Sequence, residues 1–489
     1  MRLIALHIAL LICNIASAQL MNNGSTIFIN SDAQVAVRGT SVYNNGDVKH
    51  EGYLIVDKNI SNTAQWICDS INENTIELGE NWSNDSTFLP GIGVVNFIGD
   101  NQNISGTQTT PFFKLNLMGK PLSVKALYSN IEVHHKLNLF DAELACNQSE
   151  ATMTINSLEI SRNKGFVSTK FTGRLNRQFE HQKTLYSFFP LGYNDRGKII
   201  MQPVVVTATD SGTFRTAFLY ENPSQYGMST FSLDDSLCTV NDEFFHIVGS
   251  DPEAQATFAL VSDDEYSWTK LASWKGPWTK MQGSKFGSFG QEEGFGVTDH
   301  TLGQDKPVVF ATEKPFVDIP EDLVYVPYNS SYEIKPDYYR PANSTLTWSP
   351  PDQLSCDDCP NPVYSAGLPE TYVVEIDNNS GCSASDTIRF LVTRGENNPT
   401  LIPNAFSPNF DGLNDIFLPH LYSFEELVVM SIYNRWGEKI YEGADGWDGT
   451  YRGKPVPMGS YLYKIEIKEL IKNGYHRSVH LSGILTIIR

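Results

Sequence analysis

The stretch NAFSPNFDGLND (404–415) contains the residues of this chain that most resemble a cation site. Asn409, Asp411 and Asp415 place side-chain oxygens at short intervals around a glycine, and calcium prefers such oxygen ligands. A complete EF-type loop also has a later bidentate Glu, and none follows closely enough here. Asn and Asp also close turns by hydrogen bonding to the nearby backbone. We therefore expect a turn at these three residues and keep calcium as the alternative reading.

Three tryptophans form a second candidate site. The segment LASWKGPWTKM predicts a hairpin that turns on residues 275–277, with Trp274 and Trp278 as a cross-strand pair. If these rings and Trp268 were exposed and coplanar, they would form a platform for an extracellular glycan. If they were buried, they would be hairpin core, which is the reading that we favour.

Cys356, Cys359 and Cys382 are close together in a chain of seven cysteines. In an exported protein a disulfide is the default for a close pair, although the sequence does not give the connectivity. A zinc site on these three residues would need a fourth ligand, and no histidine lies between His300 and His420. We therefore expect a disulfide within this group.

Motifs for catalysis are missing. The sequence has no G-x-S-x-G, H-E-x-x-H, P-loop or Rossmann signature. His134 and His135 are adjacent in a predicted strand, so we expect them on opposite faces, which suits no shared metal. A formal net charge of −20 argues against a nucleic-acid partner. We expect no catalytic residues and no enzyme, and the alternative is a β-helix enzyme that degrades polysaccharides.

Residues 1–18 predict a secretory signal peptide. A basic start is followed by an apolar run over residues 3–12, and Ala16-Ser17-Ala18 is a small-residue cleavage site. The run is too short to cross a bilayer, and no later segment reaches 18 apolar residues. We expect a secreted or surface-exposed protein that does not itself span the membrane.

The rest of the chain predicts an all-β protein of several parts. Short alternating strands between Asn/Gly turns over residues 19–185 favour a solenoid of stacked units, with a right-handed β-helix preferred to a β-sandwich. In this region Phe113, Leu115 and Leu117 alternate, which predicts one shared face. Residues 186–312 predict a β-sandwich module.

Residues 313–395 combine a Trp strand, a Cys-rich loop and the strong strands TYVVEI and TIRFLV. With GCSASDTIRFLV in its last hairpin, this segment resembles PKD-like, immunoglobulin-type modules, which usually serve as spacers. TRGENNPT (393–400) then predicts a linker.

Residues 396–489 contain IPNAFSPNFDGLND, IYNRWGEKIYE, GWDGTYRGKPVPMGSYLYKIE and the terminal GILTIIR, in that order. These motifs resemble the gliding-motility-associated C-terminal domain, the type B sorting signal of the Bacteroidetes type IX secretion system. The motif residues are Pro403, Asn404, Phe406, Pro408, Asn409, Asp411, Gly412, Asn414, Asp415, Asn434, Arg435, Trp436, Gly437, Trp447, Asp448, Gly449, Gly459 and Tyr461.

The resemblance implies an immunoglobulin-like sandwich that directs export across the outer membrane. It also implies two partners, the type IX translocon and an outer-membrane anchor protein of the PorP/SprF type. We expect Trp436 and Trp447 in the core, and Arg435 and Arg489 as partner contacts. Phe410 departs from the family pattern, which usually has a glycine there, and a glycine would permit a positive φ. Met458 stands where the family often has Asp or Glu.

We therefore expect a non-catalytic structural or adhesin-like protein at the cell surface, delivered by its C-terminal domain. A carbohydrate-binding surface protein is the first alternative, and the polysaccharide-degrading enzyme is the second.

Overall fold

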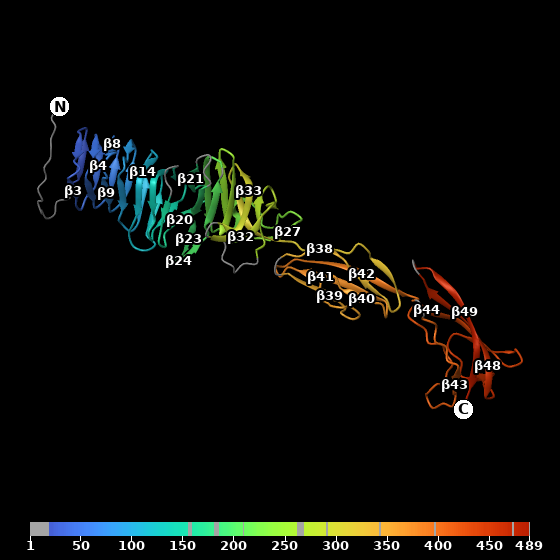
Figure 1. Cartoon of the computed structure of the whole chain (residues 1–489). Helices are drawn as coiled ribbons and strands as arrows, with labels where there is room; N and C mark the ends of the chain where they lie inside the picture. The colour runs from blue at the N-terminus through green and yellow to red at the C-terminus, as the bar shows by residue number, and fades with distance from the viewer. Residues whose placement is uncertain are drawn as a thin grey trace. The chain divides into compact units, whose positions relative to one another are not determined.

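The computed structural model describes residues 19–154, 159–179, 185–208, 210–261, 268–289, 292–341, 344–395, 398–471 and 474–488. The chain divides into two compact units, residues 1–313 and 314–489. Nearly all regular structure in the described residues is β-strand, with one short 3-10 helix, η1 (Pro223–Tyr226) (Figure 1). The all-β prediction is confirmed. None of the described helices is long and apolar enough to cross a membrane.

The N-terminal part of the first unit is a solenoid whose successive coils stack in parallel register (Figure 1). One sheet contains β1 (Leu20–Asn23), β4 (Val42–Asn45), β7 (Ile60–Asn62), β10 (Trp82–Asn84), β13 (Gln102–Ser105), β15 (Val124–Leu127), β17 (Glu143–Cys146) and β20 (Phe166–Thr169). A second sheet contains β2 (Ile27–Ile29), β5 (Val48–His50), β8 (Trp66–Cys68) and β11 (Phe88–Leu89). The third begins with β3 (Gln34–Val37), β6 (Tyr53–Val56), β9 (Thr75–Leu78), β12 (Val94–Phe97), β14 (Thr110–Leu117), β16 (Ile131–Asn138), β18 (Glu150–Met153) and β21 (Arg174–Phe179), with β19 (Glu159–Ser161) beside β16.

Alternation within each strand sends one set of side chains into a shared core. Trp66, Trp82 and Phe88 are almost fully buried there, and the Trp82 and Phe88 ring centroids are 4.9 Å apart. Each coil alone buries only one face of its strands, so stacking supplies the rest of the core. The solenoid reading is therefore the one that the structure shows.

A polar ladder runs inside the first sheet. The side-chain amides of Asn22, Asn44 and Asn62 each donate a hydrogen bond of 2.8 Å to the Oδ1 of the asparagine in the next coil, and the ladder ends at Asn84. All four side chains are buried. Buried amides are tolerated where they are hydrogen-bonded, so the ladder fixes the register of four coils.

The predicted strand faces were wrong at one place. The pairing of β14 with β16 shifts register between Phe112 and Lys114. This irregularity sends Phe112 into the core and leaves Phe113 half-exposed, whereas Leu115 and Leu117 are buried as expected.

The shift also affects the two adjacent histidines of β16, which do not point to opposite faces. His134 contacts Glu132 at 3.3 Å, and His135 stacks on Phe113 with ring centroids 4.9 Å apart. Both histidines lie at the solvent side because the β-bulge breaks the two-residue alternation.

The remainder of the first unit continues the third sheet. β21 pairs antiparallel with β26 (Gly212–Leu219), and the sheet goes on through β28 (Phe245–Asp251), β34 (Lys306–Glu313), β30 (Lys270–Trp274) and β31 (Trp278–Lys280), with β27 (Leu237–Val240) beside β34. A facing sheet contains β22 (Leu185–Phe189), β25 (Val204–Ala208), β29 (Ala254–Val261), β33 (Glu292–Leu302) and β32 (Lys285–Phe289), and β23 (Gly192–Asp195) pairs with β24 (Lys198–Met201). The expected regions 19–185 and 186–312 thus share one sheet and one core.

The second unit begins with an immunoglobulin-like module. Its main sheet has the order β36 (Leu323–Pro327), β42 (Ser383–Thr393), β41 (Glu370–Asp377) and β39 (Thr345–Ser349). Two short pairs complete it, β35 (Phe316–Asp318) with β38 (Asp337–Tyr339) and β37 (Ser331–Glu333) with β40 (Val363–Ser365).

The C-terminal sandwich follows. Its sheet has the order β43 (Ala405–Phe406), β49 (His476–Ile487), β48 (Gly459–Leu470), β44 (Glu425–Tyr433) and β45 (Lys439–Gly443), and β46 (Thr450–Tyr451) pairs with β47 (Lys454–Pro455). The long hairpin of β48 and β49 forms the centre of this sheet and positions the loops described next.

Candidate functional site

The loop after β43 is built around one carboxylate. Asp415 accepts hydrogen bonds from the backbone N–H groups of Asn409 at 2.8 Å, Phe410 at 2.6 Å and Gly412 at 2.7 Å. Desolvation raises the pKa of Asp415, but these three donors together hold it below its usual value. Asp415 therefore serves as the internal acceptor that closes the loop.

Two further turns lie inside the same loop. The Asn409 side chain accepts from the Asp411 N–H, and Asp411 accepts from the Leu413 N–H at 2.8 Å. This is the turn chemistry that the sequence predicts. The described residues contain no group of three or more His, Cys, Asp or Glu side chains that could hold a metal ion. Calcium at Asn409, Asp411 and Asp415 stays a prediction.

Phe410 adopts a left-handed backbone conformation with φ of 66°. A bulky residue is rarely found in this region, where a glycine meets no steric cost. Gly412 and Asn414 in the same loop also have positive φ, at 87° and 55°. The loop thus forms with a phenylalanine where a glycine was expected, and the Phe410 side chain is 83% exposed.

A second turn displays two large side chains. Asn434 accepts hydrogen bonds at its Oδ1 from the N–H groups of Trp436 at 2.9 Å and Glu438 at 3.1 Å, and Gly437 has φ of 79°. These contacts fix the hairpin between β44 and β45. Arg435 is exposed at its tip, and Trp436 is 85% exposed.

The expectation that Trp436 lies in the core is wrong. The side chain of Asn434 sets the turn, and this geometry turns the indole outward. Arg489, the other expected partner contact, lies outside the described residues.

Trp447 is in the core, as expected. Its ring is 1% exposed and lies 5.6 Å from the rings of Phe406 and Tyr461, centroid to centroid. Its indole N–H donates to the Thr450 carbonyl at 2.8 Å. The Trp447 ring thus packs against the end of β43 and is held to the turn at residues 448–450.

Gly449 is a position where a side chain would not fit. Its φ is 73°, and an added Cβ would lie 2.8 Å from the Pro408 Cγ. This contact packs the β43 loop against the turn after Trp447. The IPNAFSPNFDGLND motif (402–415) and the WDGT motif (447–450) are therefore in contact, although about 40 residues separate Pro408 from Trp447 in the chain.

The other motif residues hold turns or strand ends. Asp448 accepts from the Thr450 N–H at 2.9 Å, and the Tyr461 hydroxyl donates to the Pro457 carbonyl at 2.7 Å. The remaining positions are Pro403, which is half-buried; Asn404, whose carbonyl accepts from Thr486; Asn414, whose carbonyl accepts from Ser407; and Gly459, which has φ of 137°.

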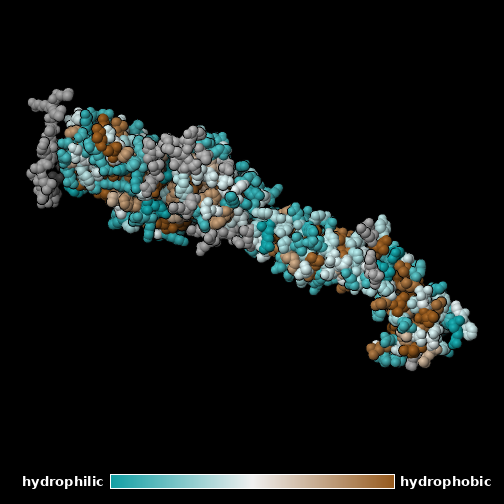
Figure 2. Space-filling view, viewed as in Figure 1, coloured by the Kyte–Doolittle hydropathy of each residue, from teal (hydrophilic) through white to brown (hydrophobic). Residues whose placement is uncertain are grey.

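A groove of about 530 Å³ lies beside the displayed turn. It is lined by Tyr433, Arg435, Leu462, Lys464 and Ile484, among others. The Lys464 ammonium lies over the Tyr433 ring, 5.7 Å from its centroid. Leu462 and Ile484 are 42% and 66% exposed. Figure 2 shows hydrophobic residues gathered on the surface of this C-terminal sandwich.

Arg394 joins the immunoglobulin-like module to the C-terminal sandwich within the second unit. It contacts Glu425 at 3.1 Å and Glu469 at 2.9 Å, and both carboxylate side chains are only 1% exposed. Arg477 also pairs with Glu469. Buried carboxylates need such partners, so the start of the expected linker 393–400 is anchored.

The three tryptophans do not form an exposed coplanar face. Trp278 is fully buried, and its ring meets Trp274 edge-on at an interplanar angle of 66°. Trp268 is half-buried and stacks on Phe310. The expected hairpin is present, with Trp274 opposite Trp278. The condition for a sugar platform is not met because the rings pack the core of the first unit.

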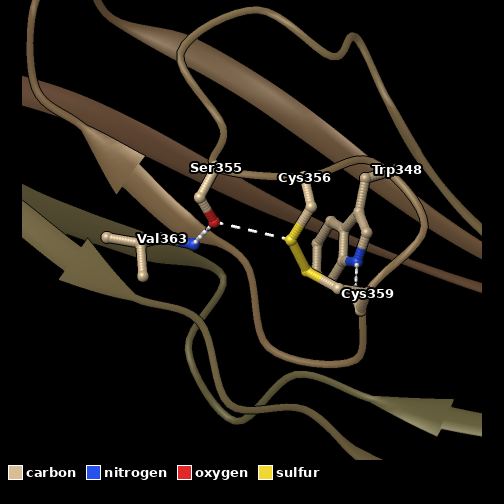
Figure 3. The surroundings of a disulfide bond; sticks show 5 residues. All are labelled: Trp348, Ser355, Cys356, Cys359 and Val363. Carbon is tan, nitrogen blue, oxygen red and sulfur yellow. Dashed lines mark hydrogen bonds between the residues drawn. A yellow bond between two sulfur atoms is a disulfide. The ribbon is translucent and has the colours of Figure 1, made fainter.

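Cys356 and Cys359 form a disulfide that closes the loop beside β39 (Figure 3). Trp348 anchors this loop, because its indole N–H donates to the Cys359 carbonyl at 3.0 Å. Ser355 contacts the Cys356 sulfur at 3.5 Å and accepts from the Val363 N–H at 2.9 Å. Cys382 lies outside this bridge. The contacts of Trp348 and Val363 with this loop are consistent with a structural role for the disulfide.

One pair that sequence reading missed resembles a Cys–His dyad. Cys68 Sγ lies 3.9 Å from His50 Nδ1 inside the solenoid. Burial raises the pKa of the Cys68 thiol to about 12 and lowers that of His50 to about 4. Both groups are thus held neutral, whereas a nucleophilic cysteine needs a lowered pKa and access to solvent. The pair belongs to the core.

Comparisons with solved structures give only weak likenesses. The human mucin-like protocadherin EC1-2 is 8% identical, with 35% of this chain and 97% of that chain covered and a TM-score of 0.18. Dpr2 Ig1-Ig2 in complex with DIP-Theta Ig1-Ig3 is 11% identical, with 48% and 93% covered and a TM-score of 0.22. Likenesses at these TM-scores do not establish a shared fold or function. No curated protein matches the chain.

The C-terminal part of the chain matches a known family. Residues 400–481 match the model of the CHU_C type IX secretion signal domain. This match covers the loop around Asp415, the turn at Asn434 and the core around Trp447. It confirms the resemblance on which the sorting-domain prediction rests. Residues 400–481 are therefore a type IX secretion signal domain, which indicates export to the cell surface or the extracellular space.

Proposed function

We propose that this protein is a non-catalytic surface protein of a Bacteroidetes bacterium with a structural or adhesin-like role. A signal peptide at residues 1–18 takes it through the general secretory route, and the C-terminal domain then directs it through type IX secretion. The solenoid and a PKD-like spacer module are the displayed cargo. The match over residues 400–481, on a loop and turn that the sequence predicts, is the observation that carries this proposal.

The secretion machinery is the partner that the signal domain implies. We propose that the turn at residues 434–437 and its groove supply the contact, because Arg435 and Trp436 project there without a packing role. An outer-membrane protein of the PorP/SprF type then retains the exported chain. Tyr461, which lines the groove, packs against the buried Trp447 ring.

The test is the location of a fluorescent reporter in a host with type IX secretion. Residues 314–489 are fused behind a signal peptide and the reporter, because a fusion that began after Arg394 would leave Glu425 without its cation and Glu469 with Arg477 alone. Reporter at the surface or in the medium supports the export signal. Reporter held in the periplasm contradicts it.

Two variants of the same fusion locate the contact. Arg435→Ala/Trp436→Ala removes two exposed side chains, so the fold is expected to survive while export falls by about tenfold or more, as for an interface hot spot. Glu426→Ala, at an exposed strand position away from the turn, is the matched control and keeps normal export. Equal export of both variants would show that the partner contacts another part of the domain.

A further inference from the structure

The first coil of the solenoid leaves three strand edges open. β1 pairs with β4, β2 with β5 and β3 with β6, and each of the three is the terminal strand of its sheet among the residues that the structure describes. All three edges belong to one coil, so they lie together at the N-terminal end of the solenoid (Figure 1). A row of unpaired backbone groups is a ready template for pairing with another chain.

The backbone hydrogen bonds show which groups are directed outward. The Tyr53 N–H donates to the Ala33 carbonyl and the Asp57 N–H to the Val37 carbonyl, so the odd-numbered residues of β3 bond to β6. Hydrogen-bonding direction alternates along a strand. Gln34 and Ala36 therefore direct their N–H and C=O groups to the open edge.

The same reasoning applies to β1 and β2. The Leu20 N–H donates to the Ser41 carbonyl, so Met21 and Asn23 present free groups. In β2, Ile27 donates to the Asp47 carbonyl, so Phe28 presents free groups.

The side chains do not protect these edges. The strands read LMNN, IFI and QVAV, with no charged residue and no proline. Exposed edges in natural proteins are usually blunted by such residues. Met21 is 64% and Phe28 54% exposed, and Leu20 and Val35 cover the core only in part. Figure 2 shows hydrophobic residues on this end of the solenoid.

The opposite end of the solenoid offers no matching surface. β21 continues into the antiparallel β26, and the far side of β20 is engaged because the Val167 N–H donates to the Pro190 carbonyl at 2.9 Å. Head-to-tail stacking of two copies would need that end to be open. A single foreign strand could cover only one of the three N-terminal edges.

We propose that the open coil pairs head to head with the same coil of a second copy of this chain. A two-fold axis that passes through β3, perpendicular to the solenoid axis, relates the two copies. It places β3 antiparallel to β3 of the partner subunit, and it places β1 beside the partner's β2. Reversing the solenoid axis reverses the sense of winding, so all three pairs are antiparallel and all three edges are satisfied at once. Met21 then lies beside Phe28 of the partner subunit. The contact is isologous and closes, which gives a dimer and not a fibre.

The inference rests on the proposed function in one respect, the removal of residues 1–18. The test therefore uses residues 19–489, released from a cleavable tag without extra residues, so its outcome does not depend on export. Sedimentation equilibrium up to about 100 µM is expected to show a dimer, a range suited to micromolar association. A monomer over this range, or a distribution of larger species, would overturn the proposal.

Outward-facing substitutions test the side-chain contact. Met21→Glu/Phe28→Glu is expected to weaken dimerisation by about 100-fold or more, because unpaired carboxylates would be buried at the contact. Leu89→Glu is the matched control, since Leu89 lies in the same outward column as Phe28, three coils away. The control dimerises normally. Equal loss in both variants would show that the contact lies elsewhere.

A second set of variants tests the backbone pairing and the symmetry. Ala36→Pro removes one outward N–H without breaking a bond to β6, so it is expected to abolish the dimer at unchanged far-ultraviolet circular dichroism, whereas Ala36→Ser keeps it. Gln34→Glu/Ala36→Glu and Gln34→Lys/Ala36→Lys are each expected to be monomeric and to form a dimer when mixed. A mixture that stays monomeric would contradict pairing of β3 with itself.

Discussion

At the scale of single residues, the most informative position is Phe410. Its φ of 66° lies in the region that L-residues avoid, and its side chain is largely exposed, so no buried contact offsets the strain. The three hydrogen bonds to the Asp415 carboxylate hold this conformation. The loop therefore stores local strain that the Asp415 interactions balance.

Replacing Phe410 by glycine is expected to stabilise the sorting sandwich by up to about 1 kcal/mol, because the relief of left-handed strain exceeds the added flexibility of the unfolded chain. Hydrogen exchange of the β48 amides, followed by mass spectrometry, measures this change. Leu413→Gly is the control, since Leu413 is also largely exposed, at 70%, but has no positive φ. It should destabilise. The same sign for both variants would contradict the strain argument.

At the scale of elements, the asparagine ladder links consecutive coils of the solenoid. Asn62 donates both to Asn84 and to the Thr87 carbonyl at 3.2 Å, and it accepts from Asn44. The loss of Asn62 leaves the buried Asn84 Oδ1 without its donor and leaves the Asn44 amide with only a 3.5 Å contact to the Gln65 carbonyl. Such groups lose their hydration without replacement, so the effect exceeds that of one hydrogen bond.

Asn62→Ala is expected to destabilise the first coils by about 2–4 kcal/mol. Asn45→Ala serves as the control, because Asn45 forms a similar amide contact with Asn23 on the exposed face and is expected to change stability by less than about 0.5 kcal/mol. Hydrogen exchange of peptides from residues 42–84 measures both. A loss of protection that is no larger for Asn62→Ala than for Asn45→Ala would contradict the ladder's role.

These elements also show how far the sequence could predict the structure. Alternation in short strands predicts stacked coils, because each strand buries one face. The β-bulge at Phe113 is not predictable from alternation, since it depends on register with the next coil. The Asn ladder had a signal, asparagines spaced by 22, 18 and 22 residues, as in the coil repeat.

The candidate site was predicted unevenly for a related reason. Motif residues identify the sorting domain and the turns around Asp415, because Asn and Asp act on their own backbone. The exposure of Trp436 could not be predicted, because contacts of Asn434 with residues two and four positions later determine it. The pairing of Arg394 with Glu425 and Glu469 needs three strands to be placed together.

At the scale of the whole molecule, two buried histidines make the first unit sensitive to acid. Burial lowers the pKa of His50 and of His246 to about 4, from the 6.5 of an exposed histidine. In the unfolded chain both would take up a proton near pH 6.5, but the folded unit resists protonation until about pH 4. Their contribution to stability is therefore complete above pH 6.5 and is lost as the pH falls.

The free energy of unfolding of this unit is expected to fall by about 3 kcal/mol per histidine between pH 6.5 and 4. Urea titrations across that range measure the slope. His50→Leu removes one titrating group, so its pH dependence should be shallower than that of the parent chain. Leu54→Val, which removes no titrating group, is the control and should keep the parent slope. An unchanged slope in His50→Leu would contradict the assignment.

The ion pairs of Arg394 couple the stability of the sorting sandwich to the folding of the module that precedes it. The cation that pairs with the buried Glu425, and with Glu469 beside Arg477, is contributed from the segment directly after β42, the last strand of the immunoglobulin-like module. If that module is misfolded, its end does not hold the guanidinium in place, and the buried Glu425 carboxylate of the sorting sandwich loses its paired cation. We therefore expect a chain with a misfolded module to be exported less well, because the stability of the signal domain would depend on the module that precedes it.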